Sequence, residues 1–142
     1  MTKAKQQLTT TPTERHQQGL GFYSAGRLEE ALDKFKAVLT EEETSDRWND
    51  WAAVQFALGS QDKAESGFRK ALELDNNNLQ VAANLGSLLV GQHRFIEAAP
   101  YLLAALKTPD GGLRSALEEV IARFPKRRTT TEATASSIAT SV

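Results

Sequence analysis

The chain has 142 residues, of which 40% are hydrophobic and 25% are charged, proportions typical of a single globular domain. It has no cysteine and two histidines, which excludes a disulfide framework and thiolate metal sites and leaves little for a histidine-rich metal centre. The first residues lack the apolar run of a secretory signal, and no stretch of 18 apolar residues is present to span a bilayer. We therefore expect a cytoplasmic protein without metal, cofactor or membrane partner.

The net charge of −1 is unevenly distributed along the chain. Residues 11–124 hold 12 basic and 17 acidic side chains, a net charge of −5, whereas Lys126, Arg127 and Arg128 follow one another directly after them. An acidic domain does not favour phosphate, and no basic face with interleaved aromatic residues is present. Nucleic acid is therefore not an expected partner.

The first helix is predicted from a capping signal. Thr11 can cap the helix, Pro12 suits its first position, and Glu14 lies three residues after the cap, as in a capping box. Residues 1–10, which precede it, are expected to be disordered. The helix should reach about residue 25, where Gly26 can adopt a left-handed conformation, and a second helix is predicted over residues 28–40.

The same order of elements recurs twice. Gly59 takes the place of Gly26 in the second unit, but the glycine of the third unit, Gly91, comes two positions earlier, so that turn is predicted to be built differently. Pro100 lies close to the start of a predicted helix, where the hydrogen bond it removes belongs to the helix entry. We expect this helix to tolerate it.

A seventh helix is predicted over residues 111–124, after the turn that begins at Thr108. Apolar residues form one stripe at helical spacing along it: Leu113, Ala116, Leu117, Val120, Ile121 and Phe124. The opposite face, predicted to meet water, holds Arg114, Ser115, Glu118, Glu119 and Arg123. Such a helix can cover the end of a stacked array. Residues 125–142, rich in Ser and Thr, are expected to form a disordered tail or linker.

Three similar stretches recur at a fixed period. Aligning Ala31, Ala64 and Ala98 gives spacings of 33 and 34 residues, a period typical of stacked helical units. We place the repeats at about 11–43, 44–77 and 78–109, with the seventh helix completing a domain that spans 11–124. An array of this kind presents an extended surface for partners.

The repeated positions carry the resemblance to a known family. They are Gly19, Phe22, Ala31, Phe35 and Val38 in the first unit, Trp48, Trp51, Ala52, Ala64, Phe68 and Ala71 in the second, and Ala82, Leu85, Gly86, Leu89, Ala98, Leu102 and Ala105 in the third. This pattern resembles the tetratricopeptide repeat. The small residues Gly19, Ala52 and Gly86 are expected where the two helices of one unit approach most closely. The resemblance implies an all-α fold: an α-solenoid of three helix-turn-helix repeats with a seventh, capping helix. Gln55 and Asn76 depart from the family pattern, so we expect less close packing or less rigidity at those two joints.

No constellation for catalysis is present. His16 and His93 lie far apart in the repeat frame, and the neighbouring carboxylates of Glu29 and Glu30 do not face one another on a helix. There is no glycine-rich phosphate loop. We expect no catalytic residue and no enzymatic activity.

The resemblance implies that the first helix of each repeat lines a concave groove. By position, the groove would be lined by His16, Gln17, Leu20, Tyr23, Asn49, Asp50, Ala53, Phe56, Ala83, Asn84, Ser87 and Val90. Gln17, Asp50 and Asn84 are equivalent positions and would form a polar row able to hydrogen-bond an extended peptide, while Tyr23 and Phe56 would receive apolar side chains. The alternative is that this polar row is only solvated.

Some family members hold a C-terminal carboxylate with a Lys/Asn/Arg clamp in this groove. The matching positions here are His16, Leu20, Asp50, Gln80 and Asn84, so that clamp is absent.

We interpret the chain as a non-enzymatic protein-interaction scaffold that binds a protein or an extended peptide. The alternative is a repeat segment of, or fused to, a glycosyltransferase or methyltransferase, serving substrate docking or assembly. A third interpretation is self-association through the N-terminal end of the array.

Overall fold

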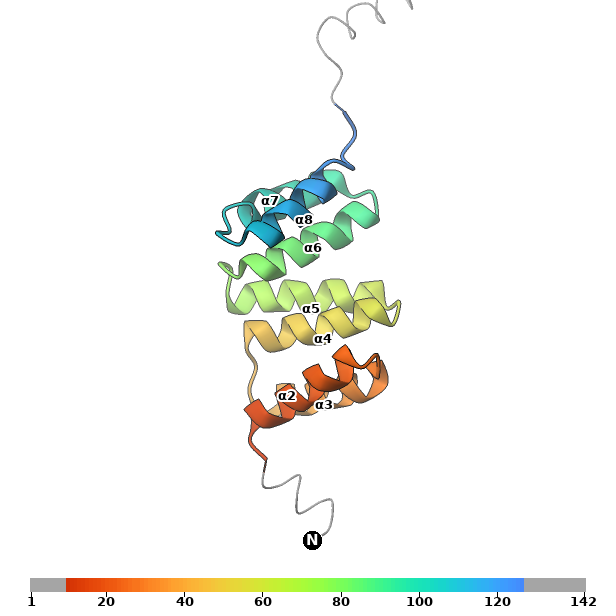
Figure 1. Ribbon diagram of the computed structural model, residues 1–142, viewed down its shortest axis with the longest axis vertical. Coiled ribbons are helices and arrows are strands. Elements are labelled where there is room, and N and C mark those ends of the chain that lie inside the picture. The colour runs from red at the N-terminus through yellow and green to blue at the C-terminus, as the bar shows by residue number, and fades with distance from the viewer. Residues whose placement is uncertain (1–9, 127–142) are drawn as a thin grey trace, which may run out of the picture.

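Three helix pairs stack along the long axis of the molecule, and a seventh helix covers the last pair (Figure 1). The computed structural model describes residues 10–126, so most of the expected disordered segments, 1–10 and 125–142, lies outside the described residues. In that part of the chain there is no strand, and the helices are α2 (Pro12–Ser24), α3 (Leu28–Glu41), α4 (Ser45–Ala57), α5 (Gln61–Leu74), α6 (Leu79–Gly91), α7 (Phe95–Ala105) and α8 (Gly111–Ile121). The all-α repeat solenoid predicted from the sequence is confirmed.

Local capping explains where several helices begin. The Thr11 hydroxyl accepts a hydrogen bond from the backbone N–H of Glu14 at 3.1 Å, and the Glu14 carboxylate accepts one from the N–H of Thr11 at 3.3 Å. This is the predicted capping box. Asn78 caps α6 and also donates to the Ser45 hydroxyl at 3.0 Å, so the start of the third repeat is bonded to the start of the second.

The three turns within the repeats share one geometry. Gly26, Gly59 and His93 all have positive φ, at 76°, 84° and 60°. The next residue in each turn donates to the carbonyl five positions back, as Arg94 does to Leu89 at 2.9 Å. The prediction of a different third turn is therefore wrong: Gly91 lies inside α6, and His93 takes the conformation that glycine adopts more readily.

Small residues let the two helices of each repeat approach closely. A Cβ on Gly19 would lie 2.5 Å from Phe35, and one on Gly86 would lie 2.6 Å from Leu102. In the second repeat both helices contribute, because a Cβ on Gly67 would lie 2.8 Å from the Cβ of Ala52. The sequence pattern identified the contact at Ala52 but not the glycine opposite it.

Each second helix packs on the next first helix, and α8 packs on α6 and α7. Leu117 of α8 is buried, and the Phe124 ring contacts that of Phe95 in a tilted arrangement with centroids 5.1 Å apart, as expected of a segment that covers the last repeat. Ala116, expected in the buried stripe, is exposed, and α8 ends at Ile121 rather than at residue 124. Helix α7 continues through Pro100, whose missing hydrogen bond falls at the helix entry.

Candidate partner-binding surface

Side chains from α2, α4, α5 and α6 enclose a pocket of about 360 Å³ on the side of the array formed by the first helices. We call it the groove pocket; it is lined by Tyr23, Ala53, Phe56, Phe68, Asn84, Ser87, Leu88, Gly91 and Arg123. Tyr23 and Phe56 occupy equivalent positions in successive repeats, and they are 39% and 50% exposed. Two large aromatic side chains that line the same pocket thus remain open to solvent.

Five of the nine predicted partner-binding residues line this pocket: Tyr23, Ala53, Phe56, Asn84 and Ser87. The other four, Gln17, Leu20, Asn49 and Asp50, do not.

Leu20 packs against the core of the first repeat, and Gln17 is exposed. Ala83 and Val90, also expected to face the groove, are each 3% exposed and belong to the core that α8 helps to cover. The expectation for these two residues is wrong, because α6 packs against α8 as well as against α5 and α7.

Two of the three residues of the predicted polar row, Asp50 and Asn84, are bonded to neighbouring repeats. Asp50 Oδ2 lies 2.7 Å from His16 Nε2 of the first repeat, and Asn84 Nδ2 donates to Asn49 Oδ1 of the second at 2.8 Å. Gln80 donates to Asn84 Oδ1 at 3.2 Å. These side chains therefore link successive first helices, and a peptide would compete with bonds they already make.

Arg123 is a lining residue that the sequence did not reveal. Its place in the predicted helix put it on the water-facing side, but the residues after Ile121 form a turn that brings it to the groove pocket. It is the one charged side chain among the described residues that line this pocket. The repeat pattern does not predict that Arg123 lines the groove pocket, because its place there depends on how α8 lies across α6.

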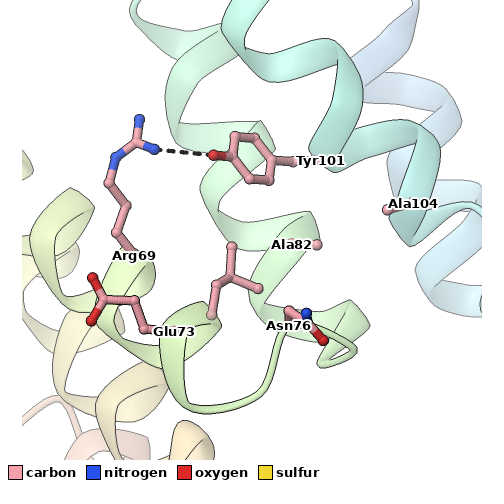
Figure 2. Close-up of a pocket in the computed structure, with 7 residues that line it drawn as sticks. Arg69, Glu73, Asn76, Ala82, Tyr101 and Ala104 are labelled. Atoms are coloured by element: carbon pink, nitrogen blue, oxygen red, sulfur yellow. Dashed lines mark hydrogen bonds between the residues drawn. The ribbon is translucent and has the colours of Figure 1, made fainter.

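A second pocket, of about 430 Å³, lies between the second helices α5 and α7 (Figure 2). Its lining includes Arg69, which points across it and donates to the Tyr101 hydroxyl at 3.0 Å, as well as Glu73 and Ala104. Arg69 also pairs with Glu65 at 3.0 Å, so its guanidinium is held by side chains of the protein itself.

Charged side chains beside this second pocket join the second and third repeats. Arg94 contacts Glu65 at 2.6 Å and Glu97 at 2.7 Å. Hydrogen bonding to the Arg94 guanidinium holds the pKa of both carboxyl groups below the usual range, and the pair with Glu97 in turn raises the pKa of Arg94. The network therefore stabilises the junction in its charged form.

A short apolar stripe lies on the outer face of α7. Ile96 is 93% exposed and Leu103 is 63% exposed, and Pro100 lies between them on the same face. At the positions of Ile96 and Leu103, the first repeat has Glu29 and Lys36. The stripe is thus a departure from the repeat pattern, and it is separate from the groove pocket.

No group of three or more His, Asp or Glu side chains within residues 10–126 is placed to hold a metal ion. None of the helices in that range is long and apolar enough to cross a membrane.

The sequence matches no family model and no curated protein, whereas many solved structures share its fold. One is the first tetratricopeptide domain of Spaghetti (RPAP3) bound to an HSP90 peptide, with a TM-score of 0.71 and 16% identity over 78% of this chain and 93% of that one. The chain has the tetratricopeptide-repeat fold.

Two bacterial proteins are similar to this tetratricopeptide domain. PilF of Pseudomonas aeruginosa gives a TM-score of 0.70 and 29% identity over 78% of this chain and 50% of that one. The Yersinia enterocolitica type III secretion chaperone SycD, in complex with a peptide of the translocator YopD, gives 0.70 and 17% over 80% and 91%. The solved structures of RPAP3 and SycD each contain a bound peptide.

Proposed function

We propose that the chain is a non-enzymatic interaction module that binds an extended segment of a partner protein in the groove pocket. The observation that carries the proposal is the exposure of Tyr23 and Phe56, which lie in successive repeats and line one concave site. Exposed aromatic side chains in a pocket are suited to receive apolar side chains of a peptide. RPAP3 and SycD hold peptides on the same fold, which supports this use of the site.

A different protein is a better partner than a second copy of the chain. The exposed side chains at the N-terminal end of the array include Thr13, Glu14, Gln17 and Gln18 of α2, all polar. Among the described residues, the one exposed large apolar side chain of α2 and α3 is Tyr23, which lines the groove pocket, so this end offers a second copy little further apolar surface. The partner we propose is a cytoplasmic protein rather than nucleic acid or a membrane.

The test compares two matched double variants by affinity capture and mass spectrometry. Tyr23→Ser with Phe56→Ser removes the aromatic pair of the groove pocket, and Ile96→Ser with Leu103→Ser removes two exposed apolar side chains of α7. We expect proteins captured by the wild type to be lost by the first variant and kept by the second. Capture of the same proteins by the groove variant would show that the groove is not the binding site.

Variants of Asp50 or Asn84 are less suitable for this test. Each side chain bonds to a neighbouring repeat, so its removal changes stability as well as the groove. Circular dichroism of both serine variants is the control for folding.

A further inference from the structure

The groove pocket combines apolar side chains with one cation. Tyr23, Phe56, Phe68 and Leu88 supply its apolar lining, and Asn84 and Ser87 are polar but uncharged. Arg123 is the remaining side chain, and no carboxylate is found among the described residues that line the pocket. The site thus offers a positive charge within a domain whose residues 11–124 carry a net charge of −5.

Arg123 differs from the other arginines of residues 10–126 in that its guanidinium makes no hydrogen bond or ion pair there. Five of them contact a carboxylate: Arg15, Arg27, Arg47, Arg69 and Arg94. Arg114 donates to the backbone carbonyl of Thr108 at 3.2 Å. The domain is acidic, and it pairs these six arginines with its own carbonyl or carboxylate groups. The guanidinium of Arg123 thus remains available in the groove pocket to bind a ligand.

A carboxylate is the group that best matches this guanidinium. The planar fork of an arginine donates two parallel hydrogen bonds to a carboxylate, and such charge-assisted bonds are stronger than neutral ones. A basic side chain at the same place would be repelled.

On the basis of the proposed function, we propose that the groove pocket selects an extended segment in which a large apolar side chain lies within a few residues of an Asp or Glu. The apolar side chain packs against Tyr23 and Phe56, and the carboxylate accepts hydrogen bonds from Arg123. Arg123 is exposed and lies beyond the end of α8, so a polypeptide has room to continue past it. We therefore assign the carboxylate to a side chain within the segment rather than to a chain terminus.

The turn after the capping helix, and not the repeats, supplies the charge selectivity. The equivalent groove positions of the three repeats are Gln17, Asp50 and Asn84, none of which is basic. The turn after α8 brings Arg123 to the end of this surface. The turn that follows the helix covering the hydrophobic end of the array therefore also contributes to ligand recognition.

The test measures binding of defined peptides by fluorescence anisotropy. The probes are short peptides with blocked termini in a Gly/Ser background, in which Phe or Leu lies one to three residues from Glu. Each has a counterpart with Gln or Lys in place of Glu, and another with Ala in place of Phe or Leu. We expect the Glu peptides to bind about tenfold more tightly than the Gln peptides and the Lys peptides to bind most weakly.

Two substitutions of Arg123 test whether the preference for Glu peptides comes from its charge rather than from the fold of the domain. Arg123→Gln should abolish the preference for Glu over Gln, and Arg123→Glu should reverse it in favour of Lys peptides. Lys107→Glu is the matched control, because it makes the same charge change at an exposed residue that does not line the groove pocket. This control should keep the wild-type preference.

The outcomes distinguish this inference from the proposed function. Equal affinity for Glu and Gln peptides, or a Glu preference that survives Arg123→Glu, would overturn the charge selectivity. If peptide binding still required Phe or Leu and was lost in the Tyr23→Ser, Phe56→Ser variant, the proposal that the groove pocket binds an extended segment would be kept. If no peptide of the set bound to the wild type, the inference would fall, and the capture experiment would decide on the groove independently.

Discussion

Helices α2 and α6 have the same role in their repeats, yet they differ greatly in burial. The one buried residue of α2 is Gly19, whereas eight residues of α6 are buried: Val81, Ala82, Ala83, Leu85, Gly86, Leu88, Leu89 and Val90. Helix α2 packs on α3 and touches α4, while α6 packs on α5, α7 and α8. Position in the array, rather than position in the repeat, determines how much of a first helix is buried.

The difference implies that stability is graded along the array. The buried core around the first repeat consists of Ala31, Phe35 and Val54, and a second, larger cluster joins the other two repeats to α8. In a stacked array each unit is stabilised mainly by its neighbours, so an end unit with few buried contacts opens first. The groove pocket spans this gradient, because Tyr23 lies on α2 and Arg123 follows α8.

The equivalent residues Phe35 and Phe68 test this gradient with the largest expected effect. Phe68 is 3% exposed in the larger cluster, so Phe68→Ala should lower the free energy of unfolding of the whole domain by about 3–5 kcal/mol. Phe35→Ala should instead release α2 and α3 in a separate transition at lower denaturant, leaving α4 to α8 folded. Urea unfolding followed by hydrogen exchange distinguishes the two cases. A single transition shifted equally by both substitutions would show that the array unfolds as one unit.

Two glycines of the first helices give a smaller and opposite pair of effects. A Cβ on Gly86 of α6 would lie 2.6 Å from Leu102 Cδ2, so Gly86→Ala should cost about 1–3 kcal/mol. Gly21 of α2 has no atom within 4 Å of that position, so Gly21→Ala should stabilise the helix by roughly 0.5–1 kcal/mol. Thermal unfolding of both variants measures the signs. Destabilisation by Gly21→Ala would mean that other parts of the protein pack against α2 at Gly21, where the structure shows open space.

The sequence predicted those features that depend on neighbours along the chain or on the repeat register. The capping box of Thr11 and Glu14 and the close approaches at Gly19 and Gly86 are of this kind. The repeat register also placed Tyr23 and Phe56 at equivalent groove positions. These features follow from helix geometry, which the spacing of residues specifies.

Features that depend on how helices lie across one another were missed. The position of Arg123 in the groove pocket depends on the angle at which α8 crosses α6, and the bond between Asn84 and Asn49 depends on side-chain conformations across a junction. The third turn was missed for another reason: His93 adopts a conformation that glycine normally marks. A rule based on glycine alone does not detect it.

His93 permits a finer test of the comparison between repeats. It has a φ of 60° where the first two turns have Gly26 and Gly59, and its ring lies 5.8 Å from that of Phe95. His93→Gly should relieve the backbone strain and raise the free energy of unfolding by less than about 1 kcal/mol, because part of the gain is offset by the lost ring contact. Gly59→Ala should have the opposite sign. Chemical denaturation of both variants checks this, and a loss of stability in His93→Gly would show that the ring contact outweighs the strain.

The smallest expected effect concerns pH and the junction between the second and third repeats. Arg94 lowers the pKa of Glu65 from its ordinary value of 4.5, so this contact stabilises the folded state above that pH. This stabilisation is lost as the pH falls through 4.5 towards the lower pKa that Glu65 has in the folded protein. Below that pKa, the Glu65 carboxyl is protonated in the folded and the unfolded protein alike. The first junction lacks the network, since Leu32 and Ser60 occupy the positions of Glu65 and Arg94. Arg94→Gln should therefore be less stable than the wild type at pH 7.

The pH dependence provides the discriminating measurement. The stability difference between Arg94→Gln and the wild type should shrink as urea unfolding is repeated from pH 6 down to pH 3, and hydrogen exchange should show the change in α5 and α7 but not in α2. Arg27→Gln is the control, because the pair of Arg27 with Glu30 is exposed and lies within one repeat. A difference between Arg94→Gln and the wild type that stayed constant with pH would mean that Arg94 stabilises the junction through the packing of its side chain rather than through its charge.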